Sequence, residues 1–129
     1  MANGVFVLVG ADQPHAVLGY YTLCATVLAP GVIPDAAKKH LPRYPLVSAT
    51  LIGRLAVASD YQGRRFGAIM LADALLRSLA SAEVVGSSMV VVDAVDETAA
   101  AFYSAHGFAR LPDSLRLVLP MRAIKPPNP

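Results

Sequence analysis

Cysteine is almost absent from this sequence, because Cys24 is the only one among 129 residues. A single thiol excludes an intramolecular disulfide framework and a metal cluster built from several cysteines, and it is typical of a protein in a reducing cytoplasm. Because Cys24 lies within an apolar stretch, we interpret it as a packed hydrophobic side chain and not as a nucleophile.

Long apolar runs and a strong charge of one sign are also missing. No run approaches the roughly 18 residues of a membrane span, and the start lacks the positive flank and apolar segment of a signal peptide. The formal net charge is +2, from 11 basic and 9 acidic residues, which is too small to indicate a nucleic-acid partner by itself. These absences predict a cytoplasmic protein with no membrane partner.

The sequence does contain enough apolar surface for one core. Hydrophobic residues make up 55% of the 129 residues, and this length is usual for a single domain. We expect one domain over residues 1–124, followed by a disordered, proline-rich tail at 125–129.

The first half of the chain reads as strands with a long loop between them. Residues 5–9 and 16–28 are β-branched and apolar runs separated by a turn, which indicates a hairpin. The stretch 30–45 carries four prolines and most of the local basic charge, so it predicts a surface loop. Residues 51–57 then read as a third strand.

The second half alternates helices with strands. Apolar residues at helical spacing predict a helix after residue 67, and the continuous apolar run 89–92 is typical of a central strand covered on both faces. Asp96 and Gly107 are placed as the N-cap and the C′ residue of a second helix, and 115–119 is the last strand. The order predicts an α/β fold of the α+β type with a mixed sheet.

A polar turn between the third strand and the helix carries Gly63, Gly67, Arg64 and Arg65. The first N–H groups of a helix have no intrahelical partners and the helix dipole favours negative charge there, so such a turn suits a pyrophosphate. Two glycines beside two arginines also occur in ordinary solvated turns. The spacing does not match a Walker A loop, which needs a lysine followed by serine or threonine.

Four short segments carry a more specific signal. They are GRLAV at 53–57, YQGRRFG at 61–67, VVDAVD at 91–96 and AFYSAHGF at 101–108. Read with the apolar helix that follows residue 67, they resemble the strand, pyrophosphate loop, next strand and final helix of the GNAT superfamily of N-acetyltransferases. The order and spacing agree, and the resemblance covers residues 5–121.

The resemblance implies an acetyl-CoA-dependent N-acetyltransferase, with acetyl-CoA as co-substrate. Backbone groups of the third strand would pair with the pantetheine arm and polarise the thioester carbonyl, and the turn would bind the pyrophosphate. Tyr103 would protonate the departing sulfur as a general acid, although a packed core tyrosine is the plainer interpretation without the resemblance. The implied cofactor-binding residues are Leu55, Ala56, Val57, Gln62, Gly63, Arg64, Arg65, Phe66, Gly67 and Ala68.

The same segments are similar to the branch of the family that acts as toxins in bacterial toxin–antitoxin pairs and acetylates the amino acid on charged tRNA. This implies aminoacyl-tRNA as the acceptor and a ribbon-helix-helix antitoxin as a partner, and it leaves a homodimer open. Lys38, Lys39 and Arg43 in the basic loop are then candidate RNA contacts. An ordinary solvated loop is the alternative interpretation of those charges.

Candidate bases and metal ligands are sparse. An α-amine titrates near ~7.7 or below, so an aminoacyl ester can lose its proton to water without a strong base. Asp93 and Asp96, both within the segment 91–96, are the nearest carboxylates, and Asp96 is better explained as a helix cap. His15, His40 and His106 are scattered along the sequence, so we expect no metal site.

Two departures from the family pattern keep other functions open. The pyrophosphate motif usually has a glycine where this sequence has Arg65. The family also begins with a strand and helices before the first strand found here, so we expect an N-terminally shortened fold. The alternatives are an acetyltransferase for a small amine or a protein amino group, and a degenerate domain that binds coenzyme A or a partner without turnover.

Overall fold

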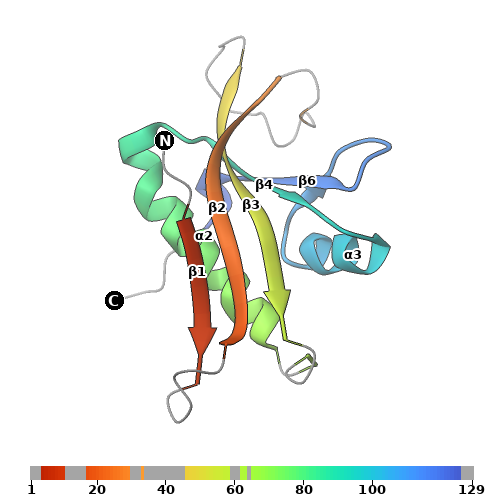
Figure 1. Ribbon diagram of the computed structural model, residues 1–129. Helices are drawn as coiled ribbons and strands as arrows, with labels where there is room; N and C mark the ends of the chain where they lie inside the picture. The colour runs from red at the N-terminus through yellow and green to blue at the C-terminus, as the bar shows by residue number, and fades with distance from the viewer. Residues whose placement is uncertain are drawn as a thin grey trace.

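The computed structural model describes residues 4–10, 17–29, 33, 46–58, 62–63 and 65–125 (Figure 1). One sheet has the strand order β1-β2-β3-β4-β6-β5. Its strands are β1 (Gly4–Val9), β2 (Val17–Leu28), β3 (Val47–Val57), β4 (Met89–Asp93), β5 (Ala109–Arg110) and β6 (Arg116–Pro120). The remaining elements are helix α2 (Phe66–Val85), helix α3 (Glu97–Ala105) and the short 3-10 helix η3 (Met121–Ala123).

The sheet is mixed, as the sequence predicts. β3 and β4 are parallel and are connected through α2, whereas the other neighbouring strands are antiparallel. Two features differ from the expectation: β3 begins at Val47, earlier than residue 51, and β5 is an additional strand. β5 contains only 2 residues, which is too short for a repeating pattern to reveal.

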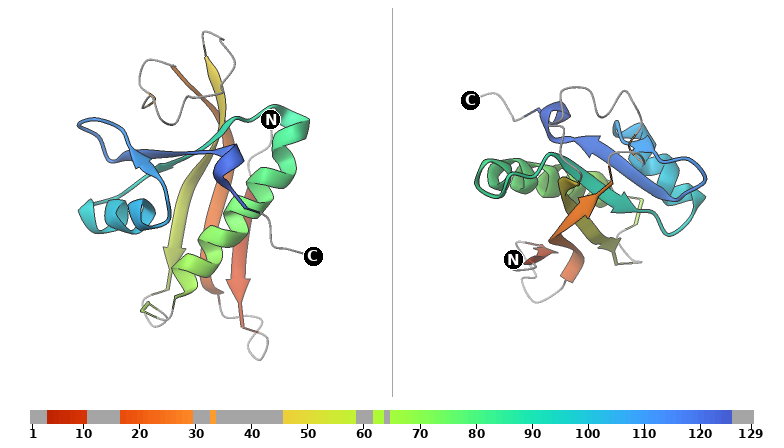
Figure 2. Two further views of the ribbon diagram at one scale, coloured as in Figure 1. Left: turned by 180° about the vertical axis from the view of Figure 1, so that it is seen from behind. Right: turned by 90° about the horizontal axis from the view of Figure 1, so that it is seen from above.

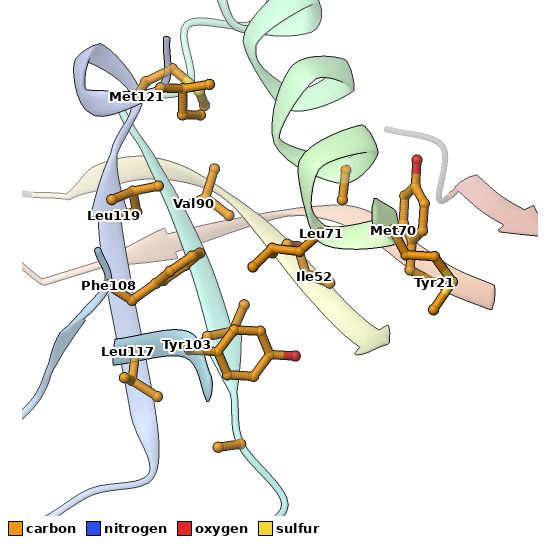
Figure 3. Close-up of a cluster of buried hydrophobic side chains, with 14 of the residues drawn as sticks. Tyr21, Ile52, Met70, Leu71, Val90, Tyr103, Phe108, Leu117, Leu119 and Met121 are labelled. Carbon is orange, nitrogen blue, oxygen red and sulfur yellow. The ribbon is translucent and has the colours of Figure 1, made fainter. Parts of the chain in front are cut away.

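Both helices pack on one face of the sheet (Figure 2). The core on this face joins Met70 and Leu71 of α2 and Tyr103 of α3 to Ile52 and Val90 of the sheet (Figure 3). A second cluster covers the opposite face at the end of the sheet away from the tip of β3; its members include Leu28, Ile33, Val47, Ala49, Met89, Val91, Leu111 and Val118. The molecule is therefore layered around β3 and β4.

Helix α2 is anchored to the sheet by a polar network as well as by its apolar face. The Tyr21 hydroxyl of β2 donates a hydrogen bond to Asp73 Oδ2, and Arg77 Nε donates to the same oxygen at 3.0 Å. Burial raises the pKa of Tyr21, and the bond from Tyr21 lowers the pKa of Asp73. The helix ends at Gly86, whose φ of 72° is readily adopted by glycine.

Helix α3 has the ends that the sequence predicts. The Asp96 carboxylate accepts a hydrogen bond from the Ala99 N–H at 2.8 Å, and Gly107, with φ of 96°, follows the C-cap residue His106. Neither α2 nor α3, the helices of the described residues, is long and apolar enough to cross a membrane.

The two central strands diverge at one end. β3 and β4 pair from Ala49 and Met89 as far as Ile52 and Val92. Beyond that point β3 continues to Val57, while β4 ends at Asp93 and leads toward α3. Figure 1 shows β1, β2 and β3 running together away from β4, β6 and α3. The sheet therefore opens between its two central strands.

Candidate active site

A cavity of about 430 Å³ lies where β3 and β4 diverge. Residues 52–56 of β3 form one wall, and residues 93–95 form the other. Tyr20 of β2 and Tyr103 of α3 also line it. The cavity thus lies at the point where the pairing between β3 and β4 stops.

One edge of the end of β3 lacks a strand partner within the described part of the chain. Leu55, Ala56 and Val57 pair with β2 on one side, and the β4 ladder stops before them on the other. Backbone N–H and C=O groups need hydrogen-bond partners when they are covered, so this edge can pair with an extended ligand. The role implied for these three residues, pairing with a pantetheine arm, stays a prediction.

A bulge marks the start of this open edge. Thr22 of β2 lies opposite both Gly53 and Arg54, because the register shifts there. The Thr22 hydroxyl accepts a hydrogen bond from the Arg54 N–H at 3.1 Å, and a Cβ at Gly53 would lie 2.7 Å from the same hydroxyl. Bulges bend a strand and increase its twist, which helps to turn β3 away from β4.

The predicted anion turn leads from the tip of β3 into α2. The side-chain amide of Gln62 donates to the carbonyl of Val57 at 3.1 Å, so the turn is tied to the end of the strand. The N-cap residue Arg65 makes no side-chain capping bond, and the first turn of α2 has no acidic residue. No carboxylate of the helix therefore competes with an anion for its positive end.

The conformation of Arg65 explains why the family pattern has a glycine here. Arg65 has φ of 64°, in the left-handed region, and Gly63 has φ of 83°. A non-glycine residue pays roughly 1–2 kcal/mol for this conformation. The turn therefore keeps the shape that a glycine would give it, and the arginine places a cation beside the helix N-terminus.

Tyr103 presents its hydroxyl to the cavity from α3. Tyr103 is 7% exposed as a residue, and its ring packs edge-on against Phe102 and Phe108 with centroid distances of 5.3 and 5.5 Å. In Figure 3 the hydroxyl points away from Phe108 and Leu117, toward β3. It makes no hydrogen bond with the described residues, and burial raises its pKa, so the phenol stays protonated and able to donate.

Asp93 forms an ion pair at the cavity that the sequence reasoning did not identify. Arg116 Nε contacts Asp93 Oδ1 at 2.7 Å and Arg116 Nη2 contacts Oδ2 at 2.8 Å. The two residues are directly opposite each other in the β4–β6 ladder. The guanidinium lowers the pKa of Asp93. Only the register of the two strands could have revealed this pair.

Some predicted site residues cannot be placed. Arg64 of the turn and Lys38, Lys39 and Arg43 of the basic loop lie outside the described residues. Phe66, Gly67 and Ala68 form the start of α2, which places them beside the turn. Among the described residues, no group of three His, Cys, Asp or Glu side chains could hold a metal ion.

These features together suit a transferase whose co-substrate is long and carries phosphate near one end. A family model described as acetyltransferase (GNAT) domain matches residues 5–110, and the chain belongs to that family.

Among curated proteins, the chain is similar to the tRNA-acetylating toxin of Mycobacterium tuberculosis, with 34% identity over 107 residues. The match covers 82% of this chain and 63% of the toxin. The chain therefore spans less than two thirds of the length of this relative.

Solved structures of toxins share the fold. KacT, in a mutant with phenylalanine in place of a tyrosine, has a TM-score of 0.85 at 30% identity, covering 93% of this chain and 72% of KacT. AtaT complexed with acetyl-methionyl-tRNAfMet has a TM-score of 0.84 at 29% identity, covering 93% and 72%. A tyrosine-to-phenylalanine mutant of AtaT bound to the C-terminus of the antitoxin AtaR and acetyl-CoA has a TM-score of 0.68 at 29% identity, covering 84% and 63%.

Proposed function

We propose that this chain is an acetyl-CoA-dependent N-acetyltransferase that acetylates the α-amine of aminoacyl-tRNA by direct transfer. The observation that carries the proposal is a cavity lined by the open edge of β3 and by Tyr103. The turn that leads into the N-terminus of α2 is tied to the tip of the same strand through Gln62. The similarity to a tRNA-acetylating toxin and to AtaT complexed with acetyl-methionyl-tRNAfMet supports the choice of acceptor.

Acetyl-CoA is the co-substrate in this proposal. Its pyrophosphate binds over Gln62 to Ala68, where the helix dipole and the arginines favour negative charge. Its pantetheine arm pairs with the free edge at Leu55 to Val57, as an added strand would. One N–H of that edge polarises the thioester carbonyl and stabilises the oxyanion that develops there.

The transfer itself needs one attack and one proton donation. The neutral α-amine attacks the carbonyl carbon, a C–N bond forms and the C–S bond breaks. Tyr103 gives its phenolic proton to the departing sulfur, the nitrogen loses its excess proton to water, and the phenol recovers a proton from water. Since the pKa of Tyr103 is raised, the phenol holds its proton until the sulfur takes it.

The remaining parts of the proposal concern partners and location. Lys38, Lys39 and Arg43 contact phosphates of the tRNA, and a ribbon-helix-helix antitoxin neutralises the enzyme. The AtaT structure with the antitoxin AtaR supports the expectation of such a partner. Charged tRNA is used in the cytoplasm, so the enzyme acts there. The proposal treats residues 1–124 as one catalytic domain.

The test is acetyl transfer from radiolabelled acetyl-CoA by the purified protein. Charged tRNA should become labelled, and mild alkali should release the label as an N-acetyl amino acid. Uncharged tRNA is the control and should stay unlabelled. Labelling of small amines or proteins but not of charged tRNA would support the alternative enzyme, and acetyl-CoA binding without any transfer would support a degenerate domain.

A further inference from the structure

The ion pair of Asp93 and Arg116 lies on the face of the sheet that carries neither α2 nor α3. Along β4, Val90 and Val92 pack into the core under the helices, whereas Met89 and Val91 pack into the cluster on the opposite face. Side chains alternate along a strand, so Asp93 continues the second set. Its cross-strand partner Arg116 lies on the same face.

The cavity is therefore lined from both sides of the sheet. Tyr103 reaches it from the face with the helices, since its ring belongs to that core. Asp93 reaches it from the opposite face. Tyr20 of β2 also lies on that face, because its neighbour Tyr21 belongs to the core under the helices. A ligand that occupies the open edge of β3 can therefore be approached at this opening by a second ligand from the far side of the sheet.

We infer that Asp93 contacts the acceptor amine on the far side of the sheet, and that Arg116 positions this carboxylate and offsets its charge. The inference rests on the proposed function and adds a residue and a direction of approach to it. Asp93 accepts a hydrogen bond from an N–H group of the amine and so aligns the nitrogen lone pair with the thioester carbonyl. Arg116 is a positioning residue, because in the unaltered protein it acts through Asp93.

The guanidinium of Arg116 allows the Asp93 carboxylate to bind the amine without holding it in its protonated form. A lone carboxylate beside an amine favours the ammonium form, which has no lone pair and cannot attack. Both oxygens of Asp93 are bonded to Arg116, so the field of the pair at the amine is much weaker than that of a single charge. Each carboxylate oxygen has a second lone pair that can still accept a hydrogen bond from the amine N–H.

The same contact accounts for the proton that the nitrogen must lose. After the C–N bond forms, the nitrogen carries an excess proton, which passes to Asp93 and then to water. The sulfur leaves with the proton of Tyr103, and water returns one to the phenol. The net reaction converts an amine and acetyl-CoA into an amide and coenzyme A, with no other reactant.

Other charged groups near this end of the sheet are already engaged or differently placed. Glu97 is paired with Arg110, and Asp96 caps α3. Arg54 is the one basic residue among the described residues that line the cavity. Among the described residues that line the cavity, Asp93 is the acidic one, so no other carboxylate there can take this role.

The experiment measures the pH dependence of kcat with charged tRNA at saturating acetyl-CoA. The rate should rise as the bound amine loses its proton, near pH 7. Arg116→Gln leaves the charge of the carboxylate unbalanced, which raises the pKa of the bound amine. The rising limb of the pH profile should therefore move to higher pH. Asp93→Asn leaves an unbalanced guanidinium, so the limb should move to lower pH, and kcat/KM for the acceptor should fall by about 10-fold or more.

The neighbouring ion pair provides a matched control. Arg110 binds Glu97 through two contacts, as Arg116 binds Asp93, but neither Arg110 nor Glu97 lines the cavity. Arg110→Gln should leave the limb in place. Arg116→Lys should return the limb toward the wild-type position. This variant also serves as the test if Arg116→Gln fails to fold. The Kd for acetyl-CoA should be unchanged in every variant.

The outcomes separate this inference from the proposed function. Suppose that the wild type transfers acetyl to charged tRNA, but the rising limb stays in place in the Asp93 and Arg116 variants or moves equally in Arg110→Gln. The proposed function would then stand, and the role of Asp93 would be overturned. If the wild type does not acetylate charged tRNA, the same profiles are measured with methionine methyl ester as acceptor. Opposite shifts of the limb with the ester would support the role of Asp93 but not tRNA as the acceptor. Absence of transfer to the ester would overturn both the role of Asp93 and the proposed function.

Discussion

Tyr103 combines a packed ring with an uncommitted hydroxyl. Fully buried polar groups are nearly always hydrogen-bonded, and this hydroxyl, which makes no hydrogen bond with the described residues, is open to the cavity that Tyr103 lines. A tyrosine needed only for packing could be replaced by phenylalanine without loss. The position of the oxygen therefore separates a structural role from a chemical one.

We expect Tyr103→Phe to lower kcat by roughly 10²-fold, because a general acid is lost while the ring still fills its place between Phe102 and Phe108. Single-turnover acetyl transfer is the measurement. Thermal unfolding and acetyl-CoA titration calorimetry serve as controls and should match the wild type. Full activity in this variant would mean that water or another group protonates the sulfur.

The residues proposed to react could be identified in the sequence more easily than their partners could. Tyr103 and the residues of the turn follow from family motifs, because a motif is local in the chain. The partner of Asp93 is 23 residues away, and it is fixed by the register of β4 against β6. Register depends on packing across the whole sheet, and no local pattern encodes it.

The first turn of α2 is shaped by its contact with α3. A Cβ added at Gly67 would lie 3.7 Å from the ring of Phe102, which is an ordinary packing distance. Alanine fits there, whereas a longer side chain must either displace Phe102 or lie across the helix N-terminus. This contact distinguishes two substitutions at one position.

Gly67→Ala should keep the Kd for acetyl-CoA close to the wild-type value and slightly raise the thermal stability, because alanine is favoured in helices by up to about 1 kcal/mol. Gly67→Leu should weaken binding by about 10-fold or more by obstructing the pyrophosphate site. Titration calorimetry of both variants is the measurement. Equal affinities of the two variants for acetyl-CoA would show that the pyrophosphate does not bind at this turn.

Most elements follow from the sequence, and the exceptions have physical causes. The caps of α3 at Asp96 and Gly107 are local signals and were predictable. The start of β3 was predicted too late, although buried Val47 and Ala49 alternate with exposed Ser48 as in a half-buried strand. The nearby prolines obscured this alternation. The divergence of β3 from β4 is a property of their pairing, and only the fold reveals it.

The charge of the whole protein is small, so its distribution decides how an RNA would bind. The net charge is +2, and three of the 11 basic residues, Lys38, Lys39 and Arg43, occur within six positions. Contacts with phosphates should therefore be concentrated in this part of the chain. A small amine that enters the cavity would not depend on them.

Replacing Lys38, Lys39 and Arg43 together with alanine should reduce acetylation of charged tRNA selectively and leave transfer to a small amine unchanged. Each lost phosphate contact should also lower the log–log slope of binding against salt by roughly one unit, or less for a single-stranded end. Binding and transfer at several salt concentrations are the measurements. Equal losses with both acceptors would contradict a specific role in RNA binding.

The opening of the sheet also divides β3 into two parts with different protection from solvent. Between Ala49 and Ile52 the strand is paired on both sides, whereas from Gly53 to Val57 it is paired with β2 only. Amides of the second part that point away from β2 should exchange their hydrogens for deuterium much faster than those of the first part. An occupant of the open edge would slow that exchange at alternate residues, and this pattern would trace its path along the strand.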